Sequence, residues 1–210
     1  MVVGATGLVG REILAVLLAD KTYAKVHSVG RRASPLSHAK LIQHQVDFAA
    51  LPSLPRVTDC FIALGTTIKV AGSQAAFRAI DFDAVRAVAL AAHASGAINA
   101  GVVSAMGADP QSMVFYNRVK GEMEGAMLEV GFDCLVIARP SMLAGQRETL
   151  GQPVRAGERI ALLVTRGLGP LIPANYRSIA AESVARSLVR AMKNGVHGNH
   201  LLLSGDMQTG

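Results

Sequence analysis

A tyrosine and a lysine that lie four residues apart, Tyr116 and Lys120, have the clearest chemical potential in this sequence. On a helix, residues at this spacing share one face. A lysine ammonium beside a phenol favours the phenolate, and such a tyrosine can give a proton to a reduced carbonyl or take one from an alcohol. Ser104 ends a predicted strand earlier in the chain, where its hydroxyl could hydrogen-bond the same carbonyl oxygen. An isolated match of this kind is more often a half-buried tyrosine beside a solvated lysine, so the surrounding elements must decide.

Three glycines near the start of the chain, Gly4, Gly7 and Gly10, predict a nucleotide-binding turn. Apolar residues precede them and an amphipathic run, residues 8–18, follows, which is the pattern of a strand, a tight turn and a helix. Gly4 can adopt backbone angles that side chains forbid. Gly7 allows the main chain to approach a pyrophosphate, which would sit on the helix N-terminus, and Gly10 allows the helix to pack close to the sheet. The ordinary alternative is a flexible turn, but the strand before it and the helix after it favour nucleotide binding.

Two arginines, Arg31 and Arg32, follow the second predicted strand, where a protein of this architecture binds the ribose of the nucleotide. An acidic residue at this place binds the 2′-hydroxyl of NAD, whereas an arginine accommodates the 2′-phosphate of NADP. Guanidinium groups suit phosphate because they are always charged and bind it in a bidentate manner. We therefore expect NADP(H) as the cofactor, and the alternative is a solvated basic turn.

Small or polar residues follow the next two predicted strands. Asp47 comes after the third strand, where such a residue often lies beside the adenine, although a plain polar strand end explains it nearly as well. Gly65 and Thr66 follow the fourth strand and leave room for the sugar and diphosphate of a cofactor.

Strands and helices alternate along the chain, which predicts an α/β fold with a doubly wound parallel sheet of Rossmann type, in a single domain of residues 1–210. The predicted strands are residues 1–3, 25–29, 41–46, 59–64, 98–104, 132–138 and 200–203, and the predicted helices are 8–18, 74–79, 82–95, 115–130, 158–166 and 180–193. We expect Ser73 to cap the second helix and Asp81 to open the third. Glycines and prolines interrupt residues 141–175, so we expect the segment 141–180 to form loops and a short helix that cover the substrate.

Several motifs together resemble those of a known family. The glycine pattern with Tyr116-x-x-x-Lys120 is similar to that of the short-chain dehydrogenase/reductases, and Gly-Ala-Thr-Gly-x-x-Gly with Arg139-Pro140-Ser141 resembles their atypical, NAD(P)-binding branch. A closer resemblance to the small oxidoreductases related to the Tat-interacting tumour-suppressor protein and its bacterial homologues rests on residues 63–67, 72–73, 77–78, 103–104, 106–109 and 116–122. This similarity covers most of the chain, from Gly4 to about Gly145.

The resemblance implies roles for individual residues, most of them toward the cofactor. The residues that would hold the pyrophosphate are Gly4, Thr6, Gly7, Leu8 and Val9, with Gly10 in the same turn. Those that would contact its other parts are Arg31 and Arg32 at the 2′-phosphate, Leu64 and Gly65 at the adenosine, and Pro140, Ser141 and Met142 at the nicotinamide. Tyr116 would be the acid/base, and Lys120 would hold the nicotinamide ribose and tune Tyr116. The family's catalytic serine often lies just beyond the position of Ser104, where this chain has Ala105 and Met106, so a protein that binds NADPH without turnover stays an alternative.

Composition limits the other classes of function. The 210 residues carry a formal charge of +6 and a pI of about 9.7, but the basic residues are scattered and aromatic residues are few, so we expect no specific binding of nucleic acid. No stretch reaches the roughly 18 apolar residues of a membrane span, and no basic-then-apolar leader precedes the glycine turn. We therefore expect a soluble cytoplasmic protein, as a monomer or a homodimer.

Cys60 and Cys134 fall on strands separated by another strand, which makes a disulfide implausible, and neither has metal-ligand spacing.

Together these observations predict hydride transfer between NADPH and a small carbonyl substrate or its alcohol, with the cofactor supplying the chemistry. The alternative from another class is a redox sensor, in which NADPH occupancy changes a partner surface. A basic nucleic-acid-binding domain is the least favoured interpretation.

Overall fold

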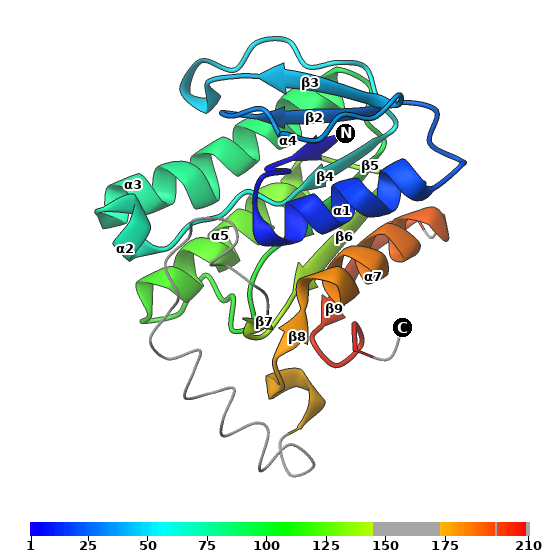
Figure 1. The fold of residues 1–210 in the computed structure, drawn as a ribbon. Helices are drawn as coiled ribbons and strands as arrows, with labels where there is room; N and C mark the ends of the chain where they lie inside the picture. The colour runs from blue at the N-terminus through cyan, green and yellow to red at the C-terminus, as the bar shows by residue number, and fades with distance from the viewer. Residues whose placement is uncertain (145–172, 196, 209–210) are drawn as a thin grey trace.

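The structure is a computed structural model that describes residues 1–144, 173–195 and 197–208. At its centre is a seven-stranded sheet in the order β3-β2-β1-β4-β5-β6-β9, in which every neighbouring pair is parallel (Figure 1). The strands are β1 (Val2–Val3), β2 (Val26–Gly30), β3 (Leu41–Gln45), β4 (Asp59–Ile62), β5 (Asn99–Val103), β6 (Cys134–Arg139) and β9 (Gly198–Leu203). The short strands β7 (Leu143–Ala144) and β8 (Ile179–Ala180) form a second sheet. The predicted single-domain α/β fold with a parallel sheet is confirmed.

Helices cover both faces of the large sheet, as Figure 1 shows. On one face, α1 (Leu8–Ala19) packs beside α7 (Ala181–Lys193). On the other face lie α4 (Val85–Ala94) and α5 (Phe115–Glu129). The remaining elements are short: η1 (Phe48–Ala50), α2 (Ile68–Ala71), α3 (Gln74–Arg78), the π-helix η2 (Ala79–Ala84) and η5 (Ala174–Tyr176).

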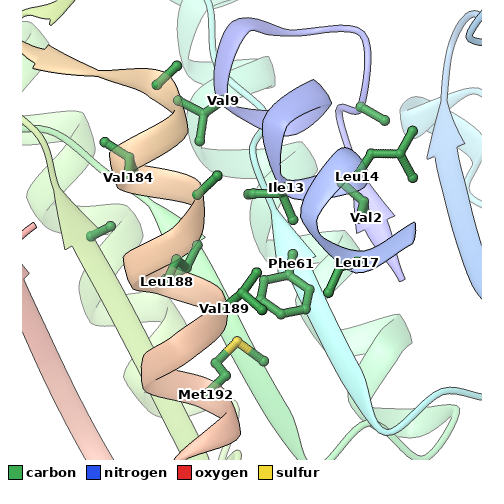
Figure 2. Close-up of a cluster of buried hydrophobic side chains, with 14 of the residues drawn as sticks. Val2, Val9, Ile13, Leu14, Leu17, Phe61, Val184, Leu188, Val189 and Met192 are labelled. Carbon is green, nitrogen blue, oxygen red and sulfur yellow. The ribbon is translucent and has the colours of Figure 1, made fainter. Parts of the chain in front are cut away.

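The core between α1, α7 and the sheet holds the first helix in place. Figure 2 shows Ile13 of α1 and Leu188 and Met192 of α7 gathered around Phe61 of β4, and all four are buried. Each large apolar side chain of this kind stabilises the fold by about 1.5–3 kcal/mol when it is fully buried. A Cβ on Gly101 of β5 would lie only 2.7 Å from the Met192 sulfur, so this glycine lets α7 approach the sheet. The same packing fixes the turn that precedes α1.

A second core joins α4 and α5 to the opposite face of the sheet. Its members include Val88 of α4, Met123 of α5, and Val102 and Ile137 of the central strands, all of them buried. Because α5 carries Tyr116 and Lys120, this core determines how far that pair lies from the carboxyl ends of the strands.

The segment around Asp81 differs from the prediction. Instead of ending and starting again at Asp81, α3, η2 and α4 follow one another without a break from Gln74 to Ala94, and Asp81 is buried inside the π-helix. The predicted cap is confirmed, since the Ser73 hydroxyl accepts a hydrogen bond from the Ala76 N–H (3.1 Å). The predicted helix 158–166, and most of the segment 141–180 that was expected to cover the substrate, lie outside the described residues.

The two cysteines lie on strands that do not touch. Cys60 is on β4 and Cys134 on β6, with β5 between them, and both are free and buried. Burial raises the pKa of the Cys60 thiol to about 12. This cysteine is therefore a packing residue without thiolate character at neutral pH.

Candidate active site at the carboxyl edge of the sheet

The loops that carry the predicted site residues leave the sheet at one edge. Because all seven strands run in the same direction, the residues that follow them meet at the carboxyl ends, where ligands bind in folds of this kind. The glycine turn follows β1, the arginines follow β2, and Asp47 follows β3. The residues from farther along the chain, which follow β4, β5 and β6, are Leu64, Gly65, Thr66, Ser104, Pro140 and Ser141.

The glycine turn is shaped by close backbone contacts. Gly4 has a φ of +87°, and a Cβ there would lie 2.8 Å from the carbonyl oxygen of Ala63. A Cβ on Gly10 would lie 2.2 Å from the carbonyl oxygen of Gly4, so only glycine lets α1 begin this close to the sheet. Among the described residues, no side chain caps the N-terminus of α1 at Gly7, so its first N–H groups have no side-chain acceptor there. The positive φ and the close packing match the roles predicted for Gly4 and Gly10, while binding of a pyrophosphate by this turn, Thr6, Leu8 and Val9 stays a prediction.

The two arginines and Asp47 lie at the outer part of this edge. Arg31 and Arg32 are exposed, and the side-chain amide of Gln45 donates to the Arg31 carbonyl (3.0 Å), which holds their turn against β3. Asp47 is exposed and accepts a hydrogen bond from the Ala49 N–H (3.0 Å), so its carboxylate caps η1. This local role accounts for Asp47 without a nucleotide, and its proposed place beside the adenine stays a prediction.

Tyr116 is held by an aromatic contact and by a loop. Its half-buried ring lies 5.4 Å, between centroids, from the ring of the buried Phe77. The loop after β5 crosses α5 closely: a Cβ on Gly121 would lie 2.2 Å from the backbone nitrogen of Pro110. The N–H of Asp109, which is on the same loop, donates to the Asn117 carbonyl of α5 (3.1 Å). These contacts fix the first turns of α5, and with them the position of Tyr116.

Lys120 is buried and paired with a residue that sequence reasoning missed. Its ammonium lies 2.8 Å from Oδ1 of Asp81, and the two side chains are 4% and 1% exposed. Oδ2 of Asp81 accepts a hydrogen bond from the Thr66 N–H (2.9 Å). A Cβ on Gly65 would lie 3.4 Å from Asp81 and 3.9 Å from the Lys120 nitrogen, so the loop after β4 closes over the pair. The only sequence signal for Asp81 is an acid set between two apolar residues.

Ser104 lies at the end of β5, where its backbone N–H and its side-chain hydroxyl differ in their hydrogen bonding. The residue is 5% exposed, and its N–H donates to the Ala138 carbonyl of β6 (2.8 Å). Among the described residues, its Oγ has no hydrogen-bond partner. A buried hydroxyl without a partner is costly, which makes Ser104 the side chain of this edge that most needs a ligand oxygen.

The segment after β6 is tied to its surroundings. The Met106 N–H donates to the carbonyl of the buried Pro140 (2.9 Å), which joins the loops after β5 and β6. The Ser141 hydroxyl bonds the Arg177 carbonyl and the Ser204 hydroxyl, the latter at 2.9 Å. Ser141 therefore anchors the C-terminal segment, and its contact with a nicotinamide stays a prediction.

A second ion pair, also missed from sequence, joins β6 to α5. The guanidinium of Arg139 donates from Nε to Oε1 of Glu124 (2.9 Å) and from NH2 to Oε2 (2.5 Å). The hydrogen bond with Glu124 is the main reason why the pKa of Arg139 is raised. Because Glu124 lies one turn beyond Lys120, this pair holds the same face of α5 on the end of the sheet.

Metal sites and membrane helices are not found in the part of the chain that the structure describes. Within it, no group of three or more His, Cys, Asp and Glu side chains could hold a metal ion. Within the same residues, no helix combines the length and the apolar character that a membrane crossing needs.

Several curated proteins are similar to this chain. The rat protein HTATIP2 is 33% identical over 202 residues, which cover 93% of this chain and 79% of that protein. The protein fmp52 of Emericella nidulans, named as mitochondrial, is 33% identical over 208 residues, which cover 93% of this chain and 88% of that protein. The match to FMP52 of Coccidioides immitis, 35% identical, is shorter and covers 70% of this chain and 66% of that protein. No protein-family model matches the chain.

The expectation of a cytoplasmic protein is wrong by this comparison. Four fungal relatives, from Coccidioides immitis, Scheffersomyces stipitis, Emericella nidulans and Eremothecium gossypii, are 33–38% identical and all carry names that place them in mitochondria. The sequence-based expectation rested on the absence of a leader before the glycine turn, which is a weak ground for assigning a compartment.

Solved structures show the same fold. MoeE5 in complex with UDP-glucose and NAD superposes with a TM-score of 0.72 at 17% identity, over 95% of this chain and 73% of that one. An oxidoreductase of the short-chain dehydrogenase/reductase family from Burkholderia thailandensis superposes with a TM-score of 0.69 at 16% identity, over 99% of this chain and 91% of that one. At such identities the likeness concerns the fold, and the relationship rests on the curated relatives. At 33% identity over 93% of its length to both HTATIP2 and the fmp52 protein of Emericella nidulans, the chain belongs to the family that these relatives form, and it has the Rossmann-type fold that the short-chain dehydrogenase/reductase from Burkholderia thailandensis also shows.

Proposed function

We propose that this protein binds NADP(H) and transfers a hydride between NADPH and a small carbonyl compound or its alcohol. The observation that carries the proposal is the meeting of three features at one edge of the sheet. The N-terminus of α1 opens there without a side-chain cap, and Ser104 follows β5 there with a hydroxyl that has no partner, both among the described residues. At the same edge, α5 begins with Tyr116 and Lys120 on one face.

The residues present fit a nicotinamide dinucleotide. In the part of the chain that the structure describes, the first N–H groups of α1 have no side-chain acceptor, which suits a pyrophosphate. Arg31 and Arg32 are exposed at the end of the neighbouring strand, the place where folds of this kind bind the ribose of the nucleotide. The buried Ser104 hydroxyl, without a partner among the described residues, fits the oxygen of a substrate beside that cofactor.

The cofactor, when bound, supplies or accepts the hydride. The protein's own residues move the proton and hold the oxygen. In the direction of reduction, the Tyr116 hydroxyl gives its proton to the oxygen of the reduced carbonyl while Ser104 donates a hydrogen bond to it. In the direction of oxidation, the Tyr116 phenolate takes the proton from the alcohol. Lys120 supports both steps through the positive potential that it exerts one helical turn away.

The arginines support NADP(H) over NAD as the preferred cofactor. The structural neighbours with a named cofactor hold NAD, as does MoeE5, but their low identity limits the comparison to the fold. In this chain, no acidic residue follows β2, and two guanidinium groups stand where the 2′-phosphate is expected.

The test is NADPH oxidation across a panel of aldehydes, ketones and quinones, followed by Tyr116→Phe on the best substrate. This variant removes one hydroxyl and keeps the ring that packs on Phe77. Because general acid catalysis by one positioned group is worth about 10² to 10⁴ in rate, turnover should fall by that order while NADPH affinity stays within a few-fold.

The matched control is Tyr23→Phe, which removes the same atom at the opposite edge of the sheet, where the Tyr23 hydroxyl donates to Asp59 (2.8 Å). Its turnover should equal that of the unaltered protein. If Tyr116→Phe keeps the full rate, the acid/base role is wrong. If no carbonyl is reduced above background while NADPH changes binding to a protein partner, the redox sensor replaces the enzyme.

A further inference from the structure

Asp81, the buried partner of Lys120, has no role in the function proposed so far. We propose that Asp81 is a positioning residue which holds the Lys120 ammonium and offsets its charge, so that the site favours the proton-donating form of Tyr116 and hence carbonyl reduction. The inference rests on the proposed function, because it assigns a direction to the proton transfer at the same site.

The pair joins three separate parts of the molecule. Asp81 belongs to η2, Lys120 to α5, and Thr66, whose N–H donates to the second oxygen of Asp81 (2.9 Å), to the loop after β4. The ammonium lies 2.8 Å from the first oxygen. One carboxylate therefore sets where the loop lies and where the lysine nitrogen lies, and a change in either is transmitted to the other.

The burial of both charges explains why an acid is needed at this place. Both side chains are almost fully buried, and a lone ion at such depth is strongly disfavoured unless it has an opposite charge and hydrogen bonds. Gly65 lies against the pair and carries no side chain that could solvate either ion. Without Asp81, the ammonium would lack a charged partner among the groups that the structure places around it.

The ion pair matters for Tyr116 because the electrostatic potentials of the Lys120 ammonium and the Asp81 carboxylate add. An ammonium near a phenol favours the phenolate, and a carboxylate paired with that ammonium opposes this effect. Reduction uses the phenol as proton donor, whereas oxidation uses the phenolate as acceptor. An ion pair in place of a free ammonium therefore shifts the balance toward the form that reduction needs.

The other charged groups on the packed elements have partners of their own or face solvent. On α5, Glu124 binds Arg139 of β6 and Glu122 binds Arg78 of α3. Asp83, the other acid of η2, and Asp109, on the loop after β5, are exposed. Asp81 is thus the buried acid that faces Lys120 in the described part of the site.

The experiment measures ionisation of Tyr116 directly, with no need for a substrate. The chain contains no tryptophan and three tyrosines, so tyrosinate absorbance in the near ultraviolet has a simple origin. Burial, followed by the nearby Asp59, raises the pKa of Tyr23, and the signals of Tyr23 and Tyr176 both cancel when a titration of Tyr116→Phe is subtracted. The full-length protein is titrated as the unaltered chain, as Asp81→Asn and as Asp83→Asn.

We expect the Tyr116 transition of Asp81→Asn to lie lower by about one pH unit, as for loss of a nearby like charge. The Asp83→Asn control removes the same charge from the same helix, but from an exposed side chain, and should match the unaltered protein. With an accepted carbonyl, the pH–rate profile of reduction should move by the same amount as the transition. A transition that stays in place in a folded Asp81→Asn protein overturns the proposal, because a purely structural aspartate would lower stability and leave ionisation unchanged.

Asp81→Asn leaves a lone buried cation and could fail to fold, so a second comparison is needed. Lys120→Gln and the double variant Asp81→Asn, Lys120→Gln differ only in the aspartate charge, and the double variant buries no ion of the pair. The transition should lie at lower pH in the double variant than in Lys120→Gln, and coincidence of the two again contradicts the role of Asp81. If the panel of carbonyls shows no turnover, the proposed function fails by itself, while these absorbance titrations still decide the role of Asp81.

Discussion

At the scale of single residues, Arg31 and Arg32 carry the choice of cofactor. Both are exposed at the end of β2, and a charge-assisted hydrogen bond to phosphate is worth roughly 1.5–3 kcal/mol. The double variant Arg31→Ala, Arg32→Ala should therefore bind NADPH at least tenfold more weakly, with little change in NADH affinity. Fluorescence titration with both cofactors measures this difference.

The control for the arginine variant is Arg56→Ala, which removes an exposed guanidinium from the loop before β4 and should leave both affinities unchanged. If the unaltered protein binds NADH and NADPH equally well, the arginines form a solvated basic turn and the predicted preference for NADP(H) is wrong.

Replacement of Ser104 by alanine is expected to keep or raise the stability of the fold and to lower the rate of turnover. Its buried Oγ has no partner among the described residues, and an unsatisfied buried polar group costs about 1–3 kcal/mol. Ser104→Ala should therefore leave the free energy of unfolding unchanged or raise it. Loss of one donor to a developing oxyanion should lower kcat by about 10² to 10³.

Urea unfolding and steady-state kinetics on the same Ser104→Ala sample separate these two effects. Ser187→Ala, which alters another serine of 5% exposure on α7, is the matched control and should keep its rate. A destabilised Ser104→Ala protein with full activity would mean that the hydroxyl is structural.

Spacing within one segment made part of the site predictable. Tyr116 and Lys120 share a helix, so four residues of separation suffice to put them on one face, and α5 confirms that helix. Asp81 reaches Lys120 from a segment that is far away in the sequence, and only the packing of η2 on α5 brings the two together. A contact between distant segments produces no periodic pattern in the sequence, so Asp81 was predicted to open a helix instead.

At the scale of elements, glycines and caps were the reliable signals because their causes are local. The positive φ of Gly4 and the cap at Ser73 each depend on a few neighbouring residues. The π-helix between α3 and α4 depends instead on non-local packing, because Asp81 and Phe77 both contact residues of α5. The boundaries of one strand differ from the prediction for a similar, non-local reason. β9 begins at Gly198, before the predicted start at His200, because it pairs with all six residues of β6.

The contact between α5 and the loop after β5 gives a prediction with an internal control. A Cβ on Gly121 would lie 2.2 Å from the Pro110 nitrogen, so Gly121→Ala must displace the loop or the helix that carries Tyr116. We expect lower stability, by about 1–3 kcal/mol as for other overpacked sites, and a lower kcat.

Gly125 is the matched site on the same helix, because a Cβ there meets nothing within 4 Å. Gly125→Ala should raise stability by roughly 0.5–1 kcal/mol through helix propensity and leave the rate unchanged. Thermal unfolding and kinetics of the two variants test the pair, and equal effects of both substitutions would show that the Pro110 contact does not matter.

At the scale of the whole molecule, the alternation of strands and helices was enough to predict the sheet, since parallel strands joined by helices have few allowed arrangements. It also placed Cys60 and Cys134 on strands separated by β5. The packing of the last helix on the first was not predictable, because the apolar face of a helix does not specify which other apolar face it will contact. In the structure α7 packs on α1, and the two ends of the described chain thereby close the core around Phe61 (Figure 2).

One ion pair reports on this closure and gives a pH-dependent prediction. Lys193 at the end of α7 lies 2.5 Å from Oδ2 of Asp20 at the end of α1, across 173 residues of sequence. Hydrogen bonds from Lys193 first, and then from Thr22, lower the pKa of Asp20 from its ordinary value of 3.8 to about 2.

A carboxyl whose pKa is lower in the folded state stabilises the fold above its unfolded pKa and loses that contribution as the pH falls. The gap in Tm between the unaltered protein and Asp20→Asn should therefore be constant above pH 3.8 and shrink as the pH approaches about 2. High salt should narrow the gap at neutral pH, because this pair is partly exposed to solvent. Asp83→Asn, which alters an exposed acid that has no lysine partner among the described residues, should show a small gap at every pH. Calorimetry across the acid range decides the matter, and an Asp20→Asn gap that widens on acidification would show that the pair does not hold α7 on α1.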